Sequence, residues 1–275
     1  MKNIKYFILA LPLAALMASC EKHDLSFADS DSTEGEALYQ ICYPRPVAVT
    51  NANGLDSLFL DGKKISGVGG RGLLTVNGYT PGSNRHFTTS VGTHKLVAYK
   101  SNNIVFEQDV TLEKGKQRVF IHNLDAAPVV IKDIYPLSPL HADGARPAER
   151  TFDSDSVARV RLYNFLYNGS TPYAGKLQYQ WSNNSDGKYT IGDWHNLGEP
   201  VGFGEATEYG EIIIHKTVHN STGYQTIRFR CLDEQGNQVA KLNDYWTQYI
   251  GRFSSHIMRG TLTGTCGYTQ LTDNV

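Results

Sequence analysis

The chain has 275 residues, a formal net charge of −1 at pH 7 and a hydrophobic content of 40 %. The net charge is close to zero, and the basic residues do not cluster in the sequence. Both observations argue against nucleic acid as a partner, because proteins that bind phosphate backbones usually carry a basic patch. The 16 Tyr, 11 Phe and 26 Gly favour β-structure with many turns.

The N-terminus has the features of an export signal. Lys2 and Lys5 precede an apolar stretch that ends at Leu16 and is shorter than the roughly 20 residues needed to span a membrane. The ending Leu16-Met17-Ala18-Ser19-Cys20 is typical of a bacterial lipoprotein signal, although an ordinary secretory signal is the alternative. We therefore predict a lipoprotein signal peptide at 1–19 and acyl chains on Cys20 that hold the protein to a membrane.

Residues 20–36 are predicted to be a tether. Few of them are apolar, and they contain a single lysine. Their acidic residues are Glu21, Asp24, Asp29, Asp31, Glu34 and Glu36. The chain is then expected to be lipid-anchored in the cell envelope, at the outer membrane. Both a periplasmic and a surface-facing orientation remain open.

Residues 37–133 are predicted to form a first β-sandwich domain of short strands. Leu58 and Leu60 alternate with polar or outward positions and lead into Asp61-Gly62, which is a strong hairpin-turn signal. A second hairpin is expected around the polar turn Ser101-Asn102-Asn103. Strands that recur every 8 to 12 residues with turns between them are typical of a sandwich.

Residues 134–156 contain Pro136, Pro139 and Pro147 and are predicted to be a linker. A second β-sandwich domain is predicted over 157–275. In its first strand Val160 and Leu162 face one way, whereas Arg159, Arg161 and Tyr163 face the other. The fold class is therefore all-β, with two immunoglobulin-like or transthyretin-like sandwiches in tandem.

The two halves resemble diverged copies of one unit. The first contains Leu58-Phe59-Leu60-Asp61-Gly62, Gly78-Tyr79 and Gly92-Thr93-His94; the second contains Val160-Arg161-Leu162-Tyr163-Asn164, Glu208-Tyr209 and a Gly251 turn before its last strand. This order is similar to the tandem immunoglobulin-like domains of unknown function that are frequent in Bacteroidota lipoproteins. The resemblance covers most of residues 40–265 and implies an envelope lipoprotein without established catalytic residues.

Three tryptophans are candidate ligand-binding residues. Trp181, Trp194 and Trp246 make the C-terminal half aromatic, and exposed aromatic faces of β-sandwich modules can hold sugar rings by stacking. Packing in the core or pairing across strands is the alternative. A glycan platform requires that the three rings be exposed together.

Other candidate sites are weaker. Cys231 and Cys266 are a candidate disulfide in an oxidising compartment, with Cys42 left over. His215 and His219 have no third metal ligand at a familiar spacing, so no metal site is predicted. The glycine-rich stretch 67–72 lacks the residues of a phosphate-binding loop, and Glu205 and Glu208 are interpreted as solvated turn residues. We expect no cofactor and no catalytic residues.

These observations favour a non-enzymatic, lipid-anchored envelope protein that acts as a binding, adhesion or assembly module. Its expected partners are the membrane, through the acyl chains on Cys20, and an envelope protein or a glycan. One alternative is a glycan-binding accessory lipoprotein of a polysaccharide-uptake system. Another is a fimbrial anchor or tip subunit, which would need a strand edge or groove that accepts a donor strand.

Overall fold

The computed structural model describes residues 36–66, 73–82, 85–134, 156–183, 194–214, 224–239 and 245–273. These residues form four β-sheets and contain no α-helix; one short 3-10 turn lies at Asn51–Asn53. The predicted all-β sandwich fold is confirmed.

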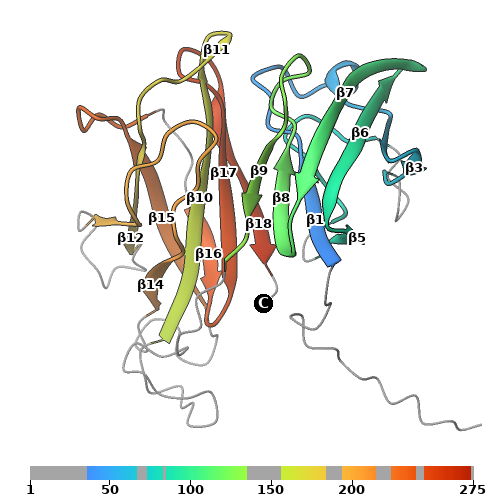
Figure 1. Ribbon diagram of the computed structural model, residues 1–275. Helices are drawn as coiled ribbons and strands as arrows, with labels where there is room; N and C mark the ends of the chain where they lie inside the picture. The colour runs from blue at the N-terminus through green and yellow to red at the C-terminus, as the bar shows by residue number, and fades with distance from the viewer. Residues whose placement is uncertain are drawn as a thin grey trace, which may run out of the picture. The chain divides into compact units, whose positions relative to one another are not determined.

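The first half of the chain supplies two sheets (Figure 1). We call the sheet with the order β4-β1-β8-β9, in which β5 also pairs with β1, the N-inner sheet, and the sheet with the order β3-β2-β6-β7 the N-outer sheet. Their strands are β1 Glu36–Cys42, β2 Ser57–Leu60, β3 Lys63–Lys64, β4 Tyr79–Thr80, β5 Phe87–Ser90, β6 Gly92–Lys100, β7 Asn103–Leu112, β8 Gly115–Phe120 and β9 Val129–Lys132.

The second half supplies two more. The C-inner sheet has the order β11-β10-β17-β18, with β14 also paired to β10, and the C-outer sheet has the order β13-β12-β15-β16. Their strands are β10 Ser156–Asn168, β11 Thr171–Pro172, β12 Gln178–Asn183, β13 His195–Asn196, β14 Gly210–Ile214, β15 Tyr224–Leu232, β16 Tyr245–Tyr249, β17 Phe253–Thr261 and β18 Cys266–Asp273.

Both halves repeat one topology. β1 pairs in parallel with β8 and antiparallel with β5, just as β10 pairs in parallel with β17 and antiparallel with β14. β8 and β17 then continue antiparallel into β9 and β18. The first and the second-last strand of each inner sheet are therefore neighbours although they are far apart in sequence.

The two hairpin turns expected in the first half are present. Asp61 and Gly62 join β2 to β3 with φ of 48° and 77°, and Ser101 and Asn102 join β6 to β7 with φ of 48° and 64°. Two successive residues with positive φ give the turn whose twist matches that of paired strands, and Gly, Asn and Asp tolerate this backbone best.

Each half has a core of its own between its inner and outer sheet. In the first half Tyr39 and Ile41 of β1 pack with Leu58, Leu96 and Phe106 of the outer sheet. In the second half Val160 and Leu162 of β10 pack with Tyr179, Ile227 and Phe229. Inward positions alternate along every one of these strands, as expected for side chains that point to opposite faces in turn.

The inner sheets are buried on both faces. Residues 39–42 of β1, 117–120 of β8 and 253–258 of β17 are buried without interruption. Strands covered on one side only would show alternating burial. The second face of each inner sheet is covered by the other inner sheet, and Cys42 and Phe120 form one apolar cluster with Tyr163, Phe165, Ile257 and Leu271.

Candidate functional site

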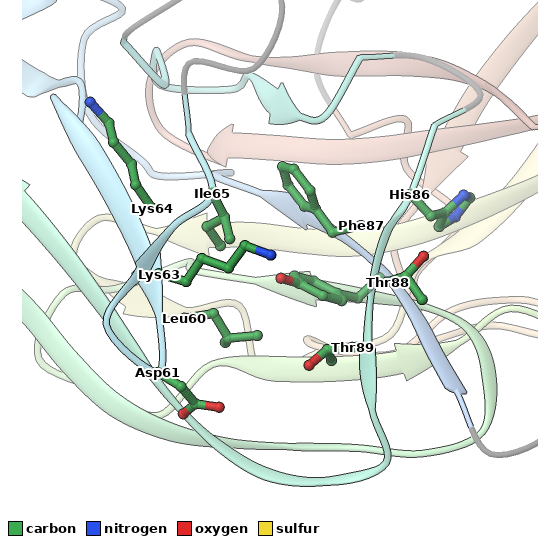
Figure 2. Close-up of a pocket in the computed structure, with 10 residues that line it drawn as sticks. Leu60, Asp61, Lys63, Lys64, Ile65, His86, Phe87, Thr88 and Thr89 are labelled. Carbon is green, nitrogen blue, oxygen red and sulfur yellow. The ribbon is translucent and has the colours of Figure 1, made fainter.

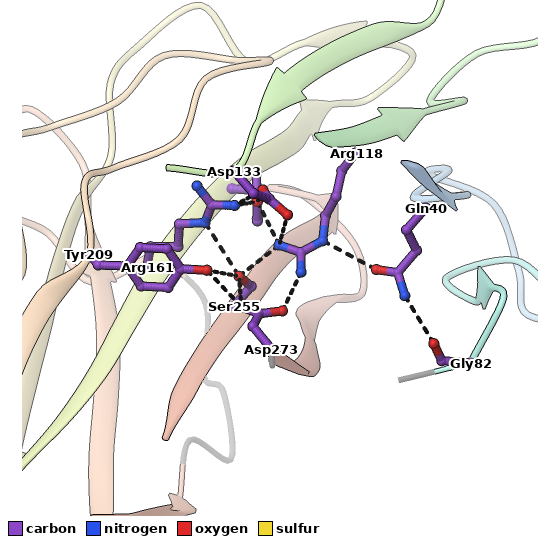
Figure 3. Close-up of polar contacts among 9 residues, drawn as sticks. Gln40, Gly82, Arg118, Asp133, Arg161, Tyr209, Ser255 and Asp273 are labelled. Carbon is purple, nitrogen blue, oxygen red and sulfur yellow. Dashed lines mark hydrogen bonds and ion pairs between the residues drawn. The ribbon is translucent and has the colours of Figure 1, made fainter. Parts of the chain in front are cut away.

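The contact between the inner sheets holds a cluster of buried charges (Figure 3). Arg118 of β8 donates from Nη1 to the Tyr163 hydroxyl at 2.6 Å and to Ser255 Oγ at 2.8 Å. Its Nη2 donates to the Asp273 carboxylate, and its Nε donates to Gln40 Oε1 at 3.2 Å. One arginine of the first half thus binds three strands of the second.

A second arginine completes the cluster from the other side. Arg161 of β10 donates to the carboxylate of Asp133, which follows β9, and to the Tyr163 hydroxyl. The Tyr209 hydroxyl donates to Asp273 Oδ2 at 2.7 Å. Burial lowers the pKa of the Arg161 guanidinium to about 10, and the Arg118 charge adds to this, although the nearby Tyr209 and Asp273 oppose it.

The cluster is balanced in charge and nearly closed to solvent. Two guanidiniums face the carboxylates of Asp133 and Asp273, and the four side chains are between 0 % and 4 % exposed. Buried charges are tolerated when they are paired and hydrogen-bonded. We assign this cluster to the positioning of the two sandwiches rather than to contact with a substrate.

An open cleft of about 580 Å³ lies at one edge of the first sandwich (Figure 2). The β2–β3 hairpin forms one wall and β5 the other, so the cleft separates the edge strands of the N-inner and N-outer sheets. Its lining residues are Tyr39, Leu60, Asp61, Lys63, Lys64, Ile65, His86, Phe87, Thr88 and Thr89. In Figure 2 Lys63 extends towards β5, whereas Lys64 and His86 point away from the cleft.

Both carboxylate oxygens of Asp61 in this cleft are hydrogen-bonded. Its Oδ2 lies 2.7 Å from His94 Nδ1, and its Oδ1 accepts from the Lys95 backbone N–H at 2.8 Å. His94 Nε2 lies 2.8 Å from the carbonyl oxygen of Ser90, so both ring nitrogens of His94 lie at hydrogen-bond distance from an oxygen atom. The hydrogen bonds from His94 and Lys95 lower the pKa of Asp61.

Tyr39 is the polar group of the cleft with the least solvent. The side chain is 2 % exposed, and burial, with a further contribution from the Asp61 charge, raises the pKa of its hydroxyl. Within the described ranges we find no hydrogen bond to that hydroxyl. Its ring packs against Phe87 with centroids 5.4 Å apart. A hydroxyl that has no protein partner and lines an open cleft is free to bond water or a ligand.

The three tryptophans do not form the exposed row that the glycan platform requires. Trp181 is 6 % exposed and belongs to the core of the second sandwich, and Trp246 packs against the same core with its ring 4.1 Å from that of His256. Both rings point inward because they pair with the inward residues Phe229 and Ile227 of β15. For these two residues the alternative, packing in the core, is what the structure shows.

Trp194 differs from the other two. It is partly exposed, and the Arg230 guanidinium lies 4.1 Å from the centre of its ring. Arg230 also donates from Nε to Gln180 Oε1 at 2.8 Å, and Gln180 donates to Asn196 Oδ1 at 2.7 Å. The Arg230 guanidinium therefore lies over this ring and is itself held by Gln180 and, through it, Asn196.

An exposed aromatic pair on that sheet was not predicted from the sequence. Tyr224 and Tyr249 lie opposite each other on β15 and β16, 41 % and 37 % exposed, with ring centroids 5.5 Å apart. The Arg252 guanidinium lies 4.0 Å from the Tyr249 ring centre. The alternation of polar and apolar residues along 224–232 could have indicated the exposure of Tyr224. Residues two apart in a strand share a face, so Tyr224 lies on the face of Arg228 and Arg230 and not on that of Ile227 and Phe229.

The candidate disulfide is not formed. Cys42, Cys231 and Cys266 are free thiols, and Cys231 Sγ accepts a hydrogen bond from the Tyr268 hydroxyl at 3.1 Å. Burial raises the pKa of Cys231 to about 12, so the group is a neutral thiol inside the core. The expectation of a Cys231–Cys266 bridge is corrected accordingly.

Several other predictions fall outside the described residues, namely those on Cys20, on the glycine-rich stretch 67–72, and on His215 and His219. Glu205 accepts from the Gly202 backbone N–H at 2.7 Å, as a turn residue does. In the part of the chain that is described, no group of histidine, cysteine and acidic side chains could hold a metal ion, and no helix is long and apolar enough for a membrane span.

No protein-family model matches the chain, and no curated protein is significantly similar to it in sequence. Among solved structures, a leucine-rich repeat protein from Bacteroides thetaiotaomicron aligns over 85 % of this chain and 27 % of its own, with 8 % identity and a TM-score of 0.21. A gamma-CGTase from alkalophilic Bacillus clarkii aligns over 84 % and 28 %, with 11 % identity and a TM-score of 0.20. The chain spans little more than a quarter of either protein.

Proposed function

We propose that this protein is a non-enzymatic, lipid-anchored envelope module that presents two sandwiches as one binding body. The observation that carries the proposal is the buried cluster of Arg118, Arg161, Asp133 and Asp273, which ties the inner sheets together. A flexible pair of domains would not need such an interface, because contacts between mobile domains are usually small and polar at their surfaces.

Because the inner sheets are buried against each other, we expect a partner to bind to the remaining surfaces. These are the cleft beside Lys63 and the outer face of the C-outer sheet around Trp194. In this proposal the acyl chains on Cys20 and the acidic segment 20–36 hold the body near a membrane, where these surfaces meet an envelope protein or a glycan.

Replacement of Cys20 tests the anchor. A Cys20→Ser chain cannot be acylated, so we expect it to move from the membrane fraction to the soluble fraction when cells are lysed and centrifuged. The matched control is Cys266→Ser, which removes a thiol from the folded part and should remain with the membranes. Retention of Cys20→Ser in the membrane fraction would contradict the proposal.

Glycan binding is the second candidate, and the partly exposed Trp194 with its polar neighbours favours it. If this ring stacks on sugar, Trp194→Ala should lose retention on immobilised mannan or xylan in affinity electrophoresis, since stacking depends on the ring face. Tyr99→Ala removes a ring from the other half and should leave retention unchanged. Equal mobility of both variants and the parent would remove this candidate.

A further inference from the structure

We propose that the cleft between the β2–β3 hairpin and β5 binds a sugar ring that carries a carboxylate, as in uronic-acid saccharides. This inference deepens the proposed function and rests on it, because it names the ligand class of a binding module. The volume of about 580 Å³ is within the usual range for small-molecule sites and accommodates a short saccharide.

The charge of the cleft selects an anion. Both carboxylate oxygens of Asp61 are already hydrogen-bonded, one to His94 and the other to the Lys95 backbone N–H. Lys63 has no ion-pair partner among the described side chains, and in Figure 2 its side chain extends from the hairpin towards β5. An ammonium group that borders a partly enclosed space binds a carboxylate more strongly than a fully solvated one does.

The remaining lining residues fit a hydroxylated ring rather than a purely apolar ligand. The Tyr39 side chain is 2 % exposed, and its hydroxyl makes no hydrogen bond within the described ranges; Thr89 contributes a second hydroxyl from β5, the strand that pairs with β1 beside Tyr39. Phe87, Leu60 and Ile65 are the apolar lining residues against which the C–H face of a sugar can pack. Anion, hydroxyls and an apolar face together describe an acidic monosaccharide unit.

The test uses the full-length chain in detergent and isothermal titration with trigalacturonate as the probe. We expect saturable binding of trigalacturonate and none of maltotriose, a neutral trisaccharide with the same α-1,4 linkage. Lys63→Gln should weaken binding about 10-fold, the usual loss for one charge-assisted contact. Lys114→Gln removes an exposed lysine outside the cleft, so it is matched in net charge and should bind as the parent does.

Tyr39→Phe separates a ligand contact from a structural role. The ring that packs on Phe87 is kept, so the unfolding midpoint should be unchanged or slightly raised while binding weakens severalfold. The proposal is overturned if trigalacturonate does not bind, if maltotriose binds equally well, or if Lys63→Gln and Lys114→Gln lose the same affinity. It is also overturned if an extended acidic peptide binds while the sugar does not, since the edges of β3 and β5 would then accept a strand.

This titration is independent of the anchor. If the chain remains in the membrane fraction but does not bind trigalacturonate, only the proposed ligand class is contradicted and the proposed function stands. If the chain binds trigalacturonate but carries no lipid, the proposed lipid anchor is contradicted and the proposed ligand class of the cleft stands.

Discussion

Replacing Arg118 by methionine should destabilise the protein by about 3–5 kcal/mol, the range observed when one partner of a buried ion pair is removed. The substitution leaves Arg161 alone with the carboxylates of Asp133 and Asp273, which are almost without solvent. It also removes the donor to Ser255 and Tyr163. The free energy of unfolding, measured by urea titration, checks the prediction.

Two further variants test whether the loss of stability in Arg118→Met comes from the unbalanced buried charge. Adding Asp273→Asn to Arg118→Met leaves one arginine with one carboxylate, so the double variant should recover a substantial part of the loss. Lys95→Gln removes an exposed lysine that lies 3.0 Å from Asp109, and it should change the free energy of unfolding far less than Arg118→Met does, because solvent screens an exposed pair. If Arg118→Met costs no more than Lys95→Gln, the buried cluster does not hold the sandwiches together.

Stability should fall steeply in acid because His256 is buried in the second sandwich. It is fully buried, its Nδ1 lies 2.5 Å from the Tyr179 hydroxyl, and the rings of Trp246 and Phe229 surround it. This burial lowers the pKa of His256 from 6.5 to about 3. The unfolded chain therefore takes up this proton at a higher pH than the folded chain does.

The sign of the stability change and the pH range in which it occurs follow from that difference in pKa. The contribution of neutral His256 is fully present above pH 6.5 and is lost progressively as the pH falls towards 3. Since one pKa unit corresponds to about 1.4 kcal/mol, the loss approaches roughly 5 kcal/mol. Burial also lowers the pKa of His86, to about 4, and adds to the same trend.

Unfolding free energies of the parent and of His256→Gln, measured between pH 7 and pH 3.5, separate this contribution. The variant starts less stable but should show a shallower dependence on pH, because the amide does not titrate. Tyr268→Phe alters the same aromatic cluster without removing an imidazole and should keep the parent slope. Identical slopes for parent and His256→Gln would show that this histidine is not the source.

The local features were predictable because they depend on neighbouring residues. Asp61-Gly62 and Ser101-Asn102 tolerate positive φ, and they form the two expected turns. The core positions Leu58, Leu60, Val160 and Leu162 were likewise expected from alternation, and each belongs to the core of its half.

The cleft could not be found in the same way. Its two walls come from residues 60–65 and 86–89, which no local pattern connects. Each wall alone looks like an ordinary hairpin or strand. Lys63 and Thr89 acquire a common role only when the sheet edges lie beside each other.

The sequence by itself determined the all-β class, the hairpin turns and the face of each strand that packs into its own sandwich. Only the tertiary structure decided what covers the opposite face. Arg118 and Arg161 lie on faces that alternation assigns away from the core, but the two inner sheets bury them against Asp133 and Asp273. The reason is physical: alternation records on which side a residue lies, whereas burial depends on partners outside the local pattern, here 28 residues away for Arg161 and 155 for Arg118.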